Sequence, residues 1–167
     1  MSCLGVHFAL TEDEVAELRS IDDEQDRLEH LQEVLEPRYV EDQPAYAGES
    51  DKAWDAMHRA LADGQLTYDG GSFPLNHVVL AGEVLYGSDD YIMSLKTPQQ
   101  ARAVSEALAD LQEISFRALY NQLDPRSYDG EIGEEDFQYT WHWLQEVRRL
   151  YATAAAEGRY VLFTADQ

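Results

Sequence analysis

Basic side chains are scarce in this sequence of 167 residues, which has 12 Lys and Arg residues against 33 Asp and Glu residues and a formal net charge of -21. A phosphate backbone is bound by Lys and Arg that displace condensed counterions, so a chain this acidic is repelled by polyanions at long range. The shortage of cations therefore argues against nucleic acid and against an anionic membrane surface as partners. It leaves a basic protein, a cation or a small ligand as partners, or a role of the charge in solubility alone.

Cysteine is nearly absent, and long apolar runs are missing. Cys3 has no second cysteine to pair with, and the five histidines do not stand at zinc-ligand spacing. No segment approaches the roughly 18 apolar residues of a membrane span, and no basic stretch followed by an apolar run opens the chain. We expect a cytoplasmic protein without a cofactor or metal.

The rest of the composition is that of a folded protein, with 44% hydrophobic and 11% aromatic residues. A chain of this length buries roughly 70% of its unfolded surface, so it needs no disulfide or structural metal. We expect one domain over residues 1–167.

Apolar periodicity predicts strands and helices along the whole chain. Leu4, Val6, Phe8 and Leu10 alternate at period two, as in a strand with one apolar face. Further strands are expected at 77–82, 91–95 and 159–164, and helices at 12–20, 23–36, 51–63, 98–122 and 134–157, with loops at 37–49 and 124–133. This order does not alternate strictly between strands and helices. It predicts an α+β fold with a small sheet that includes both terminal strands, packed by about five helices.

The first candidate site is the segment 51–58. Asp51, Trp54 and His58 follow one another at i, i+3 and i+7, which brings them to one face of a helix. In a functional interpretation Trp54 forms the wall of a cleft, His58 titrates near neutrality, and Asp51 orients it or meets a ligand. In a structural interpretation Trp54 belongs to the core, His58 is a satisfied buried imidazole, and Asp51 favours the helix dipole.

The second candidate site is the loop 82–91. Gly82 and Glu83 follow the apolar run that begins at His77, and Tyr91 ends the loop. Loops at strand ends often carry sites, so His77, Glu83 and Tyr91 join Asp51, Trp54 and His58 as candidate ligand-binding residues. Glu83 with Asp89 and Asp90 could hold a hard divalent ion, although such oxygen groups are common on acidic surfaces.

No catalytic residue is predicted. The sequence has no Gly-x-Ser-x-Gly nucleophile elbow, and Cys3 has no evident activating base.

Several segments carry a resemblance in their order along the chain. They are the opening strand to Leu10, Asp51-Lys52-Ala53-Trp54 with His58, Pro74-Leu75, Ala81-Gly82-Glu83, Tyr91 with Leu95-Lys96-Thr97-Pro98, and Ala154 to Gly158 with Val161-Leu162. Together they resemble the YfbM-like family of uncharacterised bacterial proteins. The resemblance implies a single cytosolic α+β domain and supplies no activity.

Two hypotheses on function follow. The first is a non-enzymatic acidic binding protein that neutralises a basic protein partner through the acidic loops 36–49 and 124–136. The second is an enzyme or small-ligand receptor with a cleft between the 51–58 helix and the 82–91 loop, in which Trp54, His58 and Glu83 line one pocket.

Overall fold

Both terminal strands lie in the interior of one antiparallel sheet in the computed structural model, which describes residues 3–167. The strand order is β2-β1-β5-β4-β3, and every neighbouring pair is antiparallel. The strands are β1 (Gly5–Leu10), β2 (Ala47–Asp51), β3 (Glu83–Tyr86), β4 (Tyr91–Lys96) and β5 (Tyr160–Asp166). The predicted α+β fold with both terminal strands in one sheet is confirmed.

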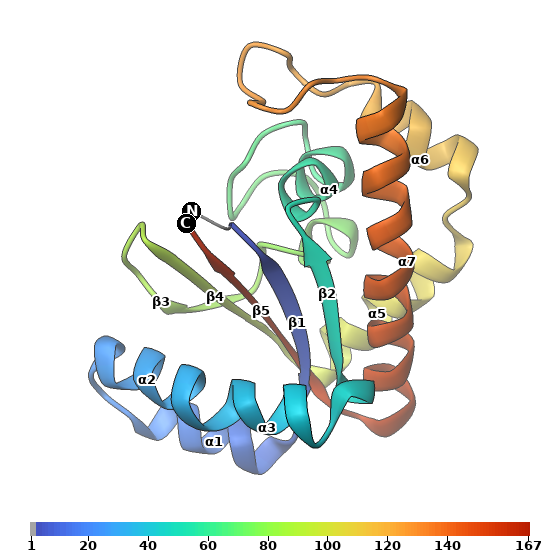
Figure 1. The fold of residues 1–167 in the computed structure, drawn as a ribbon. Helices are drawn as coiled ribbons and strands as arrows, with labels where there is room; N and C mark the ends of the chain where they lie inside the picture. The colour runs from blue at the N-terminus through green and yellow to red at the C-terminus, as the bar shows by residue number, and fades with distance from the viewer. Residues whose placement is uncertain (1–2) are drawn as a thin grey trace.

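Helices cover both faces of this sheet, so that the molecule has three layers (Figure 1). One face is covered by α1 (Glu12–Ser20) and by a continuous helix made of α2 (Glu24–His30), the π-helical turn η1 (Leu31–Leu35) and α3 (Glu36–Glu41). The other face is covered by α4 (Trp54–Leu61), α5 (Pro98–Asp110), α6 (Glu113–Tyr120) and α7 (Glu134–Glu157). Two short 3-10 turns, η2 (Pro44–Tyr46) and η3 (Leu75–His77), complete the elements.

Pro37 does not end the second predicted helix. A proline lacks the backbone N–H and crowds the carbonyl four residues earlier, which normally stops an α-helix. Here the wider π-helical turn η1 directly precedes α3 and loosens the hydrogen-bond ladder at that point. The helix therefore continues into the first part of the predicted loop 37–49, as far as Glu41, and the turn η2 and the edge strand β2 follow in the rest of that segment.

The apolar run at 77–82 is not a strand. The run begins at His77, the last residue of η3, and then crosses one face of the sheet as irregular chain. Val78 and Val79 are fully buried there. The strand of this region is β3, which occupies the first half of the predicted 82–91 loop. An apolar run of this length marks burial, and burial alone does not distinguish a strand from a buried crossing segment.

Polar side chains satisfy the carbonyl groups of this crossing segment in place of a neighbouring strand. Tyr151 Oη donates to the carbonyl oxygens of His77 and Val78, both at 2.9 Å, and His7 Nε2 donates to that of Val78 at 2.8 Å. Ser94 Oγ donates to Leu80 O at 2.6 Å, and Lys96 Nζ donates to Val79 O. The buried polar residues of the sheet therefore serve a structural need, because a buried carbonyl without a partner is costly.

Gly82 is expected to be indispensable where the crossing segment turns into β3. Its φ of +144° is rare for residues with a side chain, and a Cβ atom there would meet the backbone carbonyl of Leu95. Gly82→Ala should lower the free energy of unfolding by about 3 kcal/mol, as measured by urea denaturation. Gly158→Ala is the control, since its φ is +65° and no atom lies within 4 Å of the added Cβ; it should cost about 1 kcal/mol. Equal losses would contradict the close approach at Gly82.

Candidate functional site

The predicted pair Trp54 and His58 faces the protein interior. His58 is fully buried, and its Nε2 donates to Thr67 O at 2.8 Å. Trp54 is 4% exposed, and its Nε1 donates to Cys3 O at 2.9 Å. Burial lowers the pKa of His58 to about 4, so the imidazole is neutral at physiological pH. His58 is therefore a buried core histidine, and it does not reach a cleft.

Asp51 ends the strand β2, and α4 begins three residues later at Trp54. Its φ of +47° places it in the left-handed region, which Asp tolerates better than most residues. The carboxylate accepts a hydrogen bond from the Lys52 amide at 2.8 Å. Asp51 therefore stabilises the turn between strand and helix, whereas the sequence suggested a position within the helix.

Glu83 and Tyr91 lie on the opposite face of the sheet from Trp54 and His58. Glu83 Oε2 pairs with Arg19 of α1 at 2.7 Å, and Tyr91 Oη donates to Glu36 of α3 at 3.0 Å. Burial raises the pKa of Glu36, and burial beside that carboxylate raises the pKa of Tyr91. The structure does not bring Trp54, His58 and Glu83 into one pocket, because the sheet separates them.

His77 lies at the end of η3 and is half-buried. Its Nδ1 is 2.7 Å from Asn76 Oδ1, and its ring packs edge-on against Phe73 with a centroid distance of 4.9 Å. Burial lowers the pKa of His77 below its ordinary value. These contacts hold the ring locally, and none of them joins it to the other candidate residues.

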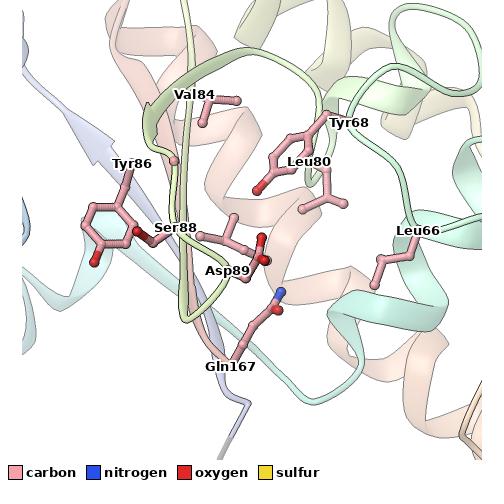
Figure 2. Close-up of a pocket in the computed structure, with 10 residues that line it drawn as sticks. Leu66, Tyr68, Leu80, Val84, Tyr86, Ser88, Asp89 and Gln167 are labelled. Carbon is pink, nitrogen blue, oxygen red and sulfur yellow. The ribbon is translucent and has the colours of Figure 1, made fainter. Parts of the chain in front are cut away.

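A hollow of about 250 Å³ does lie between the chain that follows α4 and the β3–β4 hairpin (Figure 2). We call it the hairpin hollow. It is lined by Leu66, Tyr68, Leu80, Val84, Asp89, Ile92 and Gln167, together with 86–88. It lies where the second hypothesis expected a cleft, but the residues that form it are different.

Four polar side chains of the hairpin hollow have no hydrogen-bond partner among residues 3–167: Tyr68, Ser88, Asp89 and Gln167. The Asp89 carboxylate and the Gln167 amide point into the same space in Figure 2, with Leu80 and the Tyr68 ring bordering it. Burial, and next the charge of Asp89, raise the pKa of Tyr68, so its hydroxyl keeps its proton at neutral pH. The hollow thus offers unused hydrogen-bonding groups beside apolar ones.

Only part of this residue set could be recognised in the sequence. Asp89 stood out as part of an acidic pair in a turn, whereas Tyr68 is an isolated tyrosine in the chain between α4 and η3. Gln167 reaches the hollow because its backbone N–H bonds Asp90 O at 3.0 Å, beside the end of β5. Only the pairing of β5 with β4 brings these positions together.

A second, more open hollow of about 570 Å³ lies at the start of α7. We call it the acidic hollow. It is lined by Glu131, Ile132, Gly133, Glu134, Glu135, Asp136 and Tyr139. Arg117 holds Glu134 at 2.6 Å and lowers its pKa to about 2, and Asp136 accepts hydrogen bonds from Tyr120 and Tyr128.

Within residues 3–167, no three His, Cys, Asp or Glu side chains are grouped to hold a metal ion. The pair Asp89 and Asp90 lies on the hairpin turn, away from the ion pair of Glu83 with Arg19. Over the same residues, no helix has the length and apolar character needed to cross a membrane.

Comparisons with known proteins identify a family without an assigned activity. The chain is similar to YfbM from Escherichia coli, a protein of unknown function whose crystal structure aligns with a TM-score of 0.62 and 20% sequence identity, over 97% of this chain and 99% of that one. No curated protein matches the sequence. The model of the family described as domain of unknown function DUF1877 matches residues 1–164. The chain therefore belongs to the DUF1877 family.

Proposed function

We propose that this protein is a non-enzymatic binding protein of the reducing cytoplasm whose partner is a basic protein. This proposal rests on one observation: most of the few basic side chains are bound by groups of the protein itself. Most arginines pair with carboxylates of the same chain: Arg19, Arg38, Arg59, Arg117, Arg126, Arg149 and Arg159. Arg27 and Arg148 donate to backbone carbonyls, and Lys96 is fully buried.

This use of cations leaves a surface dominated by carboxylates. With a formal net charge of -21 and most of its basic groups already engaged, the protein attracts positive partners and repels polyanions at long range. A non-enzymatic role is supported by His58, which was the best candidate for a general acid or base in the sequence. It is fully buried, and burial lowers its pKa to about 4.

The acidic hollow is the surface we propose for the basic partner. Glu131 and Glu135 are exposed and engage no cation among the described residues, while exposed Ile132 and half-buried Tyr139 add apolar surface between them. A segment with lysines or arginines and apolar residues complements this combination. The competing explanation is local, because carboxylates in the first turn of α7 also stabilise the positive end of the helix dipole.

A charge-matched pair of variants separates these explanations. Glu131→Gln combined with Glu135→Gln should weaken binding of a fluorescent peptide of alternating lysine and leucine about fivefold, since each lost rim charge contributes about 0.5 kcal/mol. The measurement is fluorescence anisotropy at low and at physiological ionic strength. Glu106→Gln combined with Asp110→Asn removes the same charge from exposed positions of α5 and should leave binding nearly unchanged. Equal weakening by both variants would overturn the proposed surface, because binding would then depend on the total charge of the protein and not on these two residues.

A small-ligand receptor is the second candidate function. Its support is the hairpin hollow, where four polar side chains without partners among the described residues border apolar ones. Clefts with a few convergent polar groups on an apolar lining are typical of small-molecule sites. The two candidate functions use different surfaces and are tested separately.

A further inference from the structure

We infer that the hairpin hollow binds a small organic cation, an ammonium or guanidinium group on an apolar stem. This inference rests on the second candidate function and names its ligand class. It is carried by the Asp89 carboxylate, which faces a hollow that no Lys or Arg lines and whose floor is apolar.

The size of the hollow limits the ligand. Its volume of about 250 Å³ lies below the roughly 300–1,000 Å³ of sites for drug-sized molecules. This volume equals the volume that about eight water molecules occupy in the liquid. A single aliphatic chain with a charged end fits this space, whereas a nucleotide or a cofactor with several rings does not.

The polar groups select the charge of the ligand. Asp89 supplies a negative charge, and the Gln167 amide oxygen and the Tyr68 hydroxyl oxygen accept hydrogen bonds. Ammonium and guanidinium groups are pure donors, so they can use all three acceptors at once. The exposed part of the Tyr68 ring adds a π face for the cation. A carboxylate or phosphate would meet Asp89 with no cation in the lining to offset the repulsion.

The apolar groups select the rest of the ligand. Leu80 and Ile92 are 2% and 4% exposed and form a floor that is continuous with the core beneath α4. Val84 is 45% exposed and borders the opening. An alkyl stem on these side chains loses its contact with water, and the lower local dielectric strengthens the ion pair with Asp89.

Adjacent aspartates provide a matched test. Asp89→Asn removes the carboxylate of the hollow, and Asp90→Asn makes the same charge change at the next residue, which does not line it. Binding of n-butylammonium and n-butylguanidinium is measured by NMR titration of backbone amides. We expect saturable shifts at Tyr68, Asp89 and Gln167, an affinity about tenfold lower in Asp89→Asn, and little change in Asp90→Asn. Equal effects of the two variants would overturn the inference.

Charge-altered probes separate failure of the ligand class from failure of the receptor function. The probes n-pentanol and butyrate have similar stems without a positive charge. If either one shifts these amides as strongly as n-butylammonium does, the hollow is a receptor for another class and the inference on cations is wrong. If no probe of any charge shifts them, the receptor function falls as well.

The cation could be a free amine or the side chain of a protein, and one further probe distinguishes these sources. Nα-acetyl-lysine N-methylamide carries the same butylammonium group on a peptide backbone. Equal affinity for it and for n-butylammonium indicates that the hollow admits the side chain of a protein. An affinity at least tenfold lower indicates a site for free amines.

Discussion

Lowering the pH from 7 to 5 should remove about 4 kcal/mol from the free energy of unfolding, through two buried histidines. His7 and His58 are both fully buried. Burial lowers the pKa of His7 to about 3 and that of His58 to about 4. Each Nε2 donates to a backbone carbonyl, and each Nδ1 is buried without a partner in the described part of the chain, so a proton added there is neither solvated nor hydrogen-bonded.

The direction of the effect follows from proton linkage. An unfolded histidine takes up its proton near pH 6.5, whereas these folded imidazoles remain neutral until about pH 4 or 3. Their contribution to stability is complete above pH 6.5 and is lost as the pH falls toward the folded pKa values. At pH 5 each histidine accounts for about 2 kcal/mol of the loss. Acidification also reduces the repulsion among the surplus carboxylates, which opposes the loss in every variant alike.

The experiment is urea denaturation of the wild type and of His7→Gln across this pH range. Gln can donate to Val78 O as the imidazole does, but it does not titrate. The difference in unfolding free energy between wild type and variant should shrink by about 2 kcal/mol between pH 7 and pH 5. His142→Gln, at an exposed position of α7, should give a difference that does not change with pH. A constant difference for His7→Gln would show that His7 gains a proton within the fold.

Local signals were strong enough to predict most helices. Thr97 and Gln100 form a capping box on either side of Pro98, the first residue of the helix, so the start of α5 follows from the sequence alone. The alternation in β1 predicts its apolar face, with Phe8 and Leu10 buried under α1. The segment 98–122 was predicted as one helix, but it divides into α5 and α6 at Leu111, where the backbone becomes extended.

The two edge strands could not be predicted, because their stabilising contacts lie far away in the sequence. In β2, Gly48 is followed by the polar run Glu49-Ser50-Asp51, and its strand geometry comes from pairing with His7. The strand β3 has four residues and pairs only with β4. Short strands with weak alternation depend on the neighbouring strand, and no periodicity within such a segment reveals that neighbour.

The candidate site was only partly predictable for a related reason. Helical spacing correctly places Trp54 and His58 on one face of α4, but spacing does not say whether that face meets solvent or the core. Position along the chain placed Glu83 near that helix, whereas its side chain lies on the α1 face. Successive residues of a strand point to opposite faces, so a shift of one residue, from Glu83 to Val84, separates the ion pair with Arg19 from the hairpin hollow.

Lys96 is an ionisable residue in a position where the protein offers no solvent to its amine. It is fully buried, and within residues 3–167 no carboxylate forms a hydrogen bond or ion pair with its amine. Its Nζ donates to Val79 O and to Ser94, with Ser94 Oγ at 3.2 Å, while the ring of Phe163 lies 5.7 Å away. Burial lowers the pKa of Lys96 well below its ordinary value. Burial therefore favours the neutral form of the amine, which acts as a hydrogen-bond donor for the crossing segment.

A neutral buried lysine makes the protein more stable as the pH rises. The unfolded lysine is protonated up to about pH 10.4, so unfolding takes up one proton at any lower pH at which the folded amine is neutral. Its contribution to stability therefore grows by about 1.4 kcal/mol per pH unit and is complete above the unfolded pKa. Tyr151 acts in the opposite direction, since burial raises its pKa, but only above about pH 10.

Lys96→Met isolates this dependence, because methionine fills similar space and does not titrate. Between pH 8 and pH 10 the unfolding free energy of the wild type should rise by about 3 kcal/mol relative to that of the variant. At pH 10 the wild type should be the more stable protein, since the variant leaves Val79 O without its donor. Lys52→Met, at an exposed position, should run parallel to the wild type over this range. Parallel curves for Lys96→Met would mean that the amine is charged in the fold, and the crossing segment would then have to open to water to solvate it.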